Sequence, residues 1–98
     1  LELLELSLAD NLLESGLDEL EEKMPKLRLL NLTGNKFKSV ESLTPLKNLH
    51  FLEHLLVYDC PLTDKDTYRS EIFELLTNLK SLDGFSKDGK SVKVIIET

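Results

Sequence analysis

Apolar residues recur along this chain in a nine-residue pattern that returns at a nearly constant spacing. Leucine or valine fills the first, fourth and sixth positions, and the pattern starts at Leu3, Leu27 and Leu52, followed by a shorter fourth copy at Leu79. Successive starts lie 24, 25 and 27 residues apart. A spacing of this size is typical of proteins that repeat one structural unit along the chain.

Each copy of the pattern predicts a short strand, because alternate residues of a strand point to opposite faces of a sheet. The fourth and sixth positions then lie in the core, and their neighbours face the other side. The ninth position carries Asn11, Asn35 and Cys60, which we expect to have a structural role: their short side chains satisfy backbone groups where the chain leaves each strand. Cys60 is the one cysteine of the chain, so no internal disulfide is expected and a reducing compartment is favoured.

The segments between the predicted strands have the patterns of helical returns. Residues 15–24 place apolar side chains on one helical face and acidic ones on the other, and Pro25 ends that helix. Residues 40–49 contain a proline, which predicts a helical turn or a 3-10 segment. Residues 66–76 predict the best helix of the chain, with Asp66 as its N-cap. Its predicted buried stripe consists of Tyr68, Ile72, Phe73, Leu75 and Leu76.

This template, Leu-x-x-Leu-x-Leu-x-x-Asn, is that of the leucine-rich repeat. It predicts an α/β fold: a leucine-rich repeat solenoid with a curved parallel sheet on the concave side and helical or 3-10 returns on the convex side. We assign residues 1–85 to the repeats and their C-terminal cap, with the cap at 66–85. Residues 86–98 form a C-terminal extension that either pairs as an edge strand or packs under the last helix. Because Leu1 begins inside a patterned segment, we expect the sequence to be a fragment that lacks upstream repeats.

Charge is distributed unevenly along the chain. The formal net charge is −6, and residues 1–25 hold 8 acidic residues against 1 basic residue. An acidic chain of this kind disfavours direct binding of nucleic acid, which needs clustered lysine and arginine. The acidic helix at 15–24 is interpreted either as a solvated convex face or as a surface for basic partners such as histone tails. The apolar runs are too short to cross a bilayer, so no membrane association is predicted.

The third, fifth and seventh positions of the template face the concave side. They are Glu5, Ser7 and Ala9 in the first copy, Leu29, Asn31 and Thr33 in the second, His54, Leu56 and Tyr58 in the third, and Ser81 and Asp83 in the fourth. Apolar side chains at Leu29, Leu56 and Tyr58 exceed what solubility requires of a solvent-facing surface. Two interpretations remain: a partner element binds this patch, or a flanking segment covers it. The partner-contact residues we predict are Glu5, Ser7, Leu29, Asn31, His54, Leu56 and Tyr58.

Catalytic and metal sites have weaker support. His50 and His54 have the i, i+4 spacing that binds a metal on a helix, with Glu53 as a nearby carboxylate, but the template places His54 on a strand. Cys60 and His54 resemble a nucleophile pair, but a solenoid turn offers no enclosed pocket or oxyanion donors. We therefore predict no enzymatic activity, no metal and no cofactor.

Several segments resemble one family, the acidic leucine-rich nuclear phosphoprotein 32 kDa family. Its features are matched at residues 16–20, 27–35, 44–47 and 68–84. The last of these resembles the C-terminal leucine-rich cap that the family shares with the spliceosomal A-prime protein and with the leucine-rich domain of an mRNA-export receptor. The resemblance implies structural roles in the cap for Leu82 and Asp83, and for Tyr68 with its hydroxyl tied to a neighbouring loop.

The resemblance also implies a non-enzymatic function. Members of the family inhibit protein phosphatase 2A, bind histones as chaperones, and join nuclear mRNA-export complexes. The resemblance therefore implies a nuclear location with shuttling to the cytoplasm. The implied partners are therefore a phosphatase, histones or export factors. The acidic tail of the family has no counterpart in residues 86–98, and Thr77 stands where the family commonly has proline. The alternative is a ribonucleoprotein scaffold similar to the spliceosomal A-prime protein.

Overall fold

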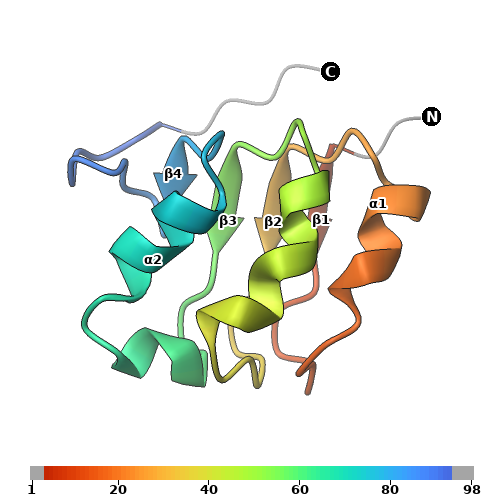
Figure 1. Ribbon diagram of the computed structural model, residues 1–98, viewed down its shortest axis with the longest axis horizontal. Coiled ribbons are helices and arrows are strands. Elements are labelled where there is room, and N and C mark those ends of the chain that lie inside the picture. Colours follow the sequence, from red (N-terminus) through yellow and green to blue (C-terminus); the bar gives the residue numbers. More distant parts are fainter. Residues whose placement is uncertain (1–3, 94–98) are drawn as a thin grey trace.

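In the computed structural model, which describes residues 4–93, four short strands form one parallel sheet. The strands are β1 (Glu5–Ser7), β2 (Leu29–Asn31), β3 (His54–Leu56) and β4 (Ser81–Leu82), and they lie side by side in chain order (Figure 1). Equivalent template positions pair across the sheet, so that Leu6 lies opposite Leu30, and Leu30 opposite Leu55. The repeat spacing therefore predicts the strand register correctly.

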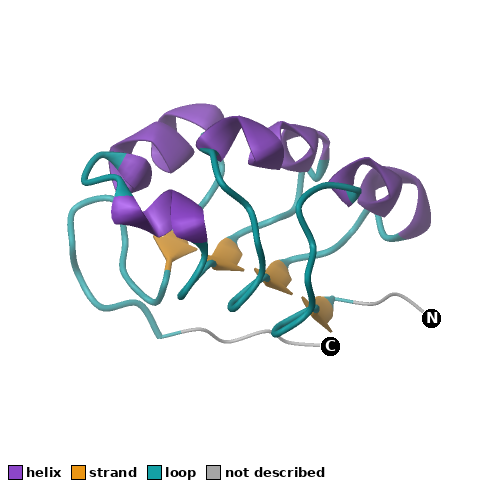
Figure 2. Cartoon of the chain, turned by 90° about the horizontal axis from the view of Figure 1, so that it is seen from below, coloured by secondary structure: helices purple, strands orange, loops and turns teal. Residues whose placement is uncertain are grey.

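Helical segments return the chain along one face of the sheet. They are η1 (Leu17–Glu19), α1 (Leu20–Lys23), η2 (Val40–Asn48), η3 (Pro61–Asp64) and α2 (Tyr68–Leu75). Figure 2 shows all of them on one side of the strands, whereas the opposite face carries no helix within residues 4–93. The predicted α/β leucine-rich repeat solenoid is confirmed, including the 3-10 character of the return at 40–48.

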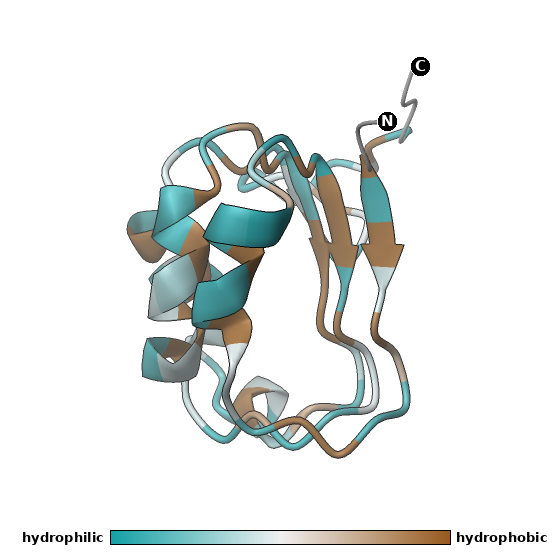
Figure 3. Cartoon of the chain, turned by 90° about the vertical axis from the view of Figure 1, so that its right-hand side faces the viewer, coloured by the Kyte–Doolittle hydropathy of each residue, from teal (hydrophilic) through white to brown (hydrophobic). Residues whose placement is uncertain are grey.

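The hydrophobic core fills the space between the sheet and the helices. Leu30, Leu32, Leu55 and Val57, at the fourth and sixth template positions, are fully buried. Figure 3 shows the helices and the strands on opposite sides of this layer, both with apolar stretches in brown. Burying each such side chain contributes about 1.5–3 kcal/mol. The equivalent residues of the first repeat, Leu6 and Leu8, are only partly buried.

The start of α2 differs from the prediction at Asp66. The helix begins at Tyr68, and Thr67 is the N-cap residue. The Thr67 hydroxyl donates a hydrogen bond of 2.5 Å to the Glu71 carboxylate, and its oxygen accepts none from the backbone amides of the first helical turn. The chain first makes the short 3-10 helix η3, which no sequence pattern predicted, and residues 65–67 are then needed to turn into α2.

The turn after each of the first three strands uses a left-handed backbone at the eighth template position. Asp10 and Asp59 have φ of 58° and 57°, and Gly34 has φ of 75°. A Cβ atom at Gly34 would displace the Asp10 carboxylate, so both the local space and the left-handed backbone favour glycine at this position. Asp10 and Asp59 tolerate the same backbone because short polar side chains adopt it more readily than others.

After β4 the chain forms a tight hairpin. Phe85 pairs antiparallel with Leu82 and with Ser91 through isolated bridges, and the Val92 amide donates to the Gly84 carbonyl oxygen at 2.9 Å. The predicted edge strand falls mostly on residues 94–98, which lie outside the described residues. Among residues 4–93, no helix has the length and apolar character needed to cross a membrane.

Candidate functional site

The concave face of the sheet brings the predicted partner-contact residues into in-register rows. One row contains Glu5, Leu29, His54 and Ser81, and the next contains Ser7, Asn31 and Leu56. The parallel pairing places residues from repeats some 25 positions apart beside one another. The face is therefore continuous across all four strands.

Apolar and aromatic side chains remain accessible in the middle and at the β4 end of this face. Leu29 and Leu56 are half-buried, and Tyr58 is 49% exposed. The Tyr58 hydroxyl donates to the Asp83 carbonyl oxygen at 2.6 Å, which fixes the ring. Phe85 is 46% exposed just beyond the turn that follows β4. Phe85 pairs antiparallel with Leu82, whose side chain is buried in the core, so Phe85 is not counted on the concave face. We call Leu29, Leu56 and Tyr58 the concave strip.

His54 does not face solvent as the template predicts. Only 5% of its surface is exposed, and its Nδ1 lies 2.7 Å from the Ser81 Oγ, which is also buried. Burial lowers the pKa of His54 and so favours the neutral imidazole. His54 lies on the predicted face, but its side chain is buried beside the small Ser81. The expectation that it is accessible to a partner is wrong.

Asp83 is a second concave-side residue that is buried, with 4% of its surface exposed. Its Oδ1 accepts a hydrogen bond of 2.8 Å from the Val57 amide, and its Oδ2 accepts one of 3.1 Å from the Tyr68 hydroxyl. The Asp83 amide donates to the Leu55 carbonyl oxygen at 2.9 Å. The carboxylate therefore joins α2 to the chain that leaves β3.

The buried Asn35 links the first two repeats through its side-chain amide. Its Nδ2 donates to the carbonyl oxygens of Leu8 and Leu32, both at 2.9 Å. Its Oδ1 accepts a hydrogen bond of 3.1 Å from the Leu13 amide. One side chain thus satisfies three backbone groups, two of which belong to the preceding repeat.

Asn11 and Cys60 occupy the same template position as Asn35, but their side chains donate fewer hydrogen bonds between repeats. Asn11 is exposed, and its Nδ2 donates only to the nearby carbonyl oxygens of Leu8 and Ala9, at 2.8 and 3.3 Å. The Cys60 thiol is buried and donates to the Leu32 carbonyl oxygen, with a sulfur-to-oxygen distance of 3.2 Å. Burial raises the pKa of Cys60, so the thiol keeps the proton that it donates.

A row of charged side chains precedes the strands and was not anticipated. Arg28, Glu53 and Lys80 occupy the second position of three successive repeats. Arg28 Nη2 lies 2.5 Å from Glu53 Oε1, and Lys80 Nζ lies 2.6 Å from Glu53 Oε2. The ion pairs to Lys80 and Arg28 lower the pKa of Glu53. Comparing the second positions of the repeats would have revealed this alternation of charge.

Replacing Glu53 with glutamine is expected to lower the free energy of unfolding by about 1–2 kcal/mol at neutral pH, because both cations lose a charged acceptor. The folded chain holds the Glu53 pKa below its ordinary value of 4.5, so folding favours the ionised form. This contribution is complete above pH 4.5 and is lost as the pH falls through the lowered pKa. Urea unfolding at several pH values should therefore show that the unfolding free energies of the parent protein and of Glu53→Gln become equal at low pH. A difference that stays constant would contradict the role of this carboxylate.

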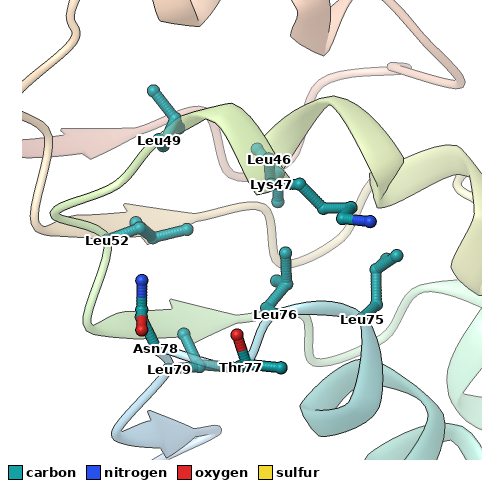
Figure 4. Close-up of a pocket in the computed structure, with 9 residues that line it drawn as sticks. All are labelled: Leu46, Lys47, Leu49, Leu52, Leu75, Leu76, Thr77, Asn78 and Leu79. Atoms are coloured by element: carbon teal, nitrogen blue, oxygen red, sulfur yellow. The ribbon is translucent and has the colours of Figure 1, made fainter.

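The described residues offer little for catalysis. Within 4–93, no group of three histidine, cysteine, aspartate or glutamate side chains is arranged to hold a metal ion; His50 is exposed before β3, whereas His54 is buried. A cavity of about 70 Å³ lies on the helix side, between the end of η2 and the chain after α2, and Figure 4 shows the residues that line it. Leucines such as Leu46, Leu52 and Leu76 line most of it, and its polar lining residues are Lys47, Thr77 and Asn78, so no histidine, cysteine or carboxylate lies among the residues that line it. The concave strip is therefore the main candidate for molecular recognition.

Comparison with known proteins gives the same architecture. A family model described as leucine-rich repeat matches residues 2–93. The solved Drosophila melanogaster SNF/U2A' complex contains a chain that superposes with a TM-score of 0.77 at 28% identity over 91% of this chain. The Mex67 LRR domain from Chaetomium thermophilum gives a TM-score of 0.75 at 26% identity over 93% of this chain. The Chaetomium Mex67:Mtr2 structure gives 0.71 at 28% identity over 93%.

These similar chains are longer than the present one. The chain spans 48% of the matched chain in the SNF/U2A' complex. It spans 59% and 60% of the two Mex67 chains. The similarity therefore covers one part of each larger protein.

Proposed function

Because this chain belongs to the leucine-rich repeat family, which is a protein-interaction fold without enzymatic chemistry, we propose that it binds a protein partner through its concave strip. The observation that carries the proposal is the accessibility of Leu29, Leu56 and Tyr58 on a sheet face that no described helix covers. Accessible apolar side chains flanked by polar ones are typical of protein-binding surfaces. The polar flank includes Glu5, Ser7 and Asn31.

We further propose that the partner is one of those bound by acidic leucine-rich nuclear phosphoproteins, namely a phosphatase, a histone or an export factor, and that the protein acts in the nucleus. The sequence segments that resemble this family support the proposal. The exposed carboxylates of Asp18, Glu19, Glu21 and Glu22 on the first return add a surface suited to basic partners.

A second candidate is a scaffold within a ribonucleoprotein. Its support is the 28% identity and TM-score of 0.77 to a chain of the SNF/U2A' complex, a protein that itself works in a complex. Under this proposal the same concave strip contacts a protein component of the particle and no nucleic acid. The two candidates differ in the partner and agree on the surface.

A pull-down with the purified chain separates the two candidates. Core histones retained in preference to splicing-particle proteins support the first, and the reverse result supports the second. Retention of neither group contradicts the histone partner and the ribonucleoprotein scaffold and leaves the general interaction role.

The surface itself is tested by replacing Leu56 and Tyr58 with glutamate. We expect binding of the retained partner to weaken about 30-fold or more, because two apolar contacts are replaced by charges in the centre of the interface. Leu12 is 80% exposed outside the concave strip, so Leu12→Glu is the matched control and should bind as the parent does. Circular dichroism of all three proteins checks that the fold is kept. Unchanged binding by the folded double variant would refute the concave strip as the binding surface.

A further inference from the structure

Two neighbouring hollows lie between η2 and α2, on the helix side and away from the concave strip. Figure 1 shows η2 as the yellow-green helix next to α2. One hollow is the cavity of about 70 Å³ already described, and the other, of about 320 Å³, is lined by three glutamates together with less polar residues. Leu75 belongs to the lining of both. We call the two hollows together the helix-side groove.

The smaller hollow is suited to an apolar side chain. Figure 4 shows its lining leucines, which are Leu46, Leu49, Leu52, Leu75, Leu76 and Leu79. Its other lining residues, Lys47, Thr77 and Asn78, are exposed, so the hollow reaches the surface. Water in such a space finds few hydrogen-bond partners, whereas an apolar side chain gains dispersion contacts and is removed from solvent.

The larger hollow is suited to a cation. Glu41 on η2 and Glu74 on α2 are exposed in its lining, and neither forms an ion pair within the part of the chain that the structure describes. The third glutamate, Glu71, is already paired with Lys65 at 3.1 Å. Lys47 is the single cation among the lining residues and belongs to the smaller hollow. The two unpaired carboxylates therefore attract a positive side chain to the larger hollow.

We propose that the helix-side groove binds a segment of a partner protein that places an apolar side chain in the smaller hollow and a lysine or arginine beside Glu41 and Glu74. Lys47 sets this order, because it repels a second cation from the smaller hollow. The groove lies on the face opposite the concave strip, so this interaction is independent of the proposed function. A chain of this kind binds one partner on each face.

Short synthetic peptides test the groove directly. Each contains one leucine and one arginine, separated by one, two, three or four glycine or serine residues. NMR spectra of the nitrogen-labelled chain should show peptide-induced shifts at the amides of Leu75, Thr77 and Asn78, and little change at Leu29 and Leu56 on the strands. For the spacing that binds best, replacing the arginine with neutral citrulline should weaken binding about tenfold at low ionic strength. Replacing the leucine with alanine should weaken it by a similar factor.

Matched variants of the protein assign the charge effect. Glu41→Gln/Glu74→Gln should bind the arginine and citrulline peptides equally, since both unpaired carboxylates are removed. Glu21→Gln/Glu22→Gln changes the net charge by the same amount at exposed sites on α1 and should keep the tenfold difference.

Leu56→Glu/Tyr58→Glu should also keep the difference between the peptides, which separates the groove from the concave strip. Binding of none of the four spacings, or shifts confined to the strands, would overturn the groove as a binding site. Equal binding of the arginine and citrulline peptides by the parent overturns it as well. The same holds if the difference persists in Glu41→Gln/Glu74→Gln or disappears in Glu21→Gln/Glu22→Gln.

Discussion

Replacing Asp83 with alanine is expected to lower the free energy of unfolding by about 2–4 kcal/mol, a large share of the 5–15 kcal/mol typical of a small domain. The Asp83 carboxylate is the acceptor for the Val57 amide and the Tyr68 hydroxyl, and only 4% of the residue is exposed. Removing it leaves both donors without a partner where water has little access. For a chain of this size the midpoint of thermal unfolding should fall by about 10–20 °C.

Two milder substitutions separate the bonds of Asp83. Tyr68→Phe removes the hydroxyl alone and should cost about 1 kcal/mol, since the bond to the Val57 amide is kept. Asp83→Asn keeps one acceptor oxygen and should be intermediate. Urea unfolding of the three variants ranks their stabilities. If Asp83→Ala were no less stable than Tyr68→Phe, the bond to Val57 would contribute nothing to stability.

Asn35→Ala should be destabilising by a similar amount, about 2–4 kcal/mol, because three hydrogen bonds are lost in a buried site. The carbonyl oxygens of Leu8 and Leu32 keep other donors, from Asn11 and Cys60. The Leu13 amide loses the acceptor that Asn35 supplies, and this loss contributes much of the expected cost.

Asn11→Ala is the matched control at the same position of the preceding repeat. Asn11 is exposed, and its two bonds reach only its own turn, so the expected loss is below about 1 kcal/mol. Denaturant unfolding of both variants measures the difference. Equal losses of unfolding free energy would mean that the hydrogen bonds of Asn35 between repeats contribute no more to stability than those of Asn11 within its own turn.

The repeating leucines make the strands and their register predictable, because side chains in a strand alternate and the repeat spacing brings equivalent positions together. Leu30 and Leu55 are buried and paired as the template requires. The same alternation assigns His54 to the concave face but gives no depth of burial, which depends on the neighbouring Ser81. The strands and their register can thus be predicted from the sequence, whereas the exposure of individual side chains on the concave face cannot.

Features that join different repeats are harder to predict than features within one repeat. The row of Arg28, Glu53 and Lys80 appears only when three repeats are compared at one position. The exposure of Phe85 depends on the hairpin that follows β4, a segment with no template. At α2, both Asp66 and Thr67 are good N-cap residue types, and the path of the chain out of η3 selects Thr67.

The incomplete burial of the first repeat has a consequence for the exchange of amide protons with solvent. In a solenoid each repeat is stabilised mainly by its neighbours, so segments open separately with different free energies. The amides of Leu8 and Asp10 donate to the carbonyl oxygens of Asn31 and Thr33, just as those of Leu32 and Gly34 donate to Leu56 and Tyr58. Leu8 is partly buried and Leu32 fully buried, so the pair in the first repeat should incorporate deuterium well before the pair in the second.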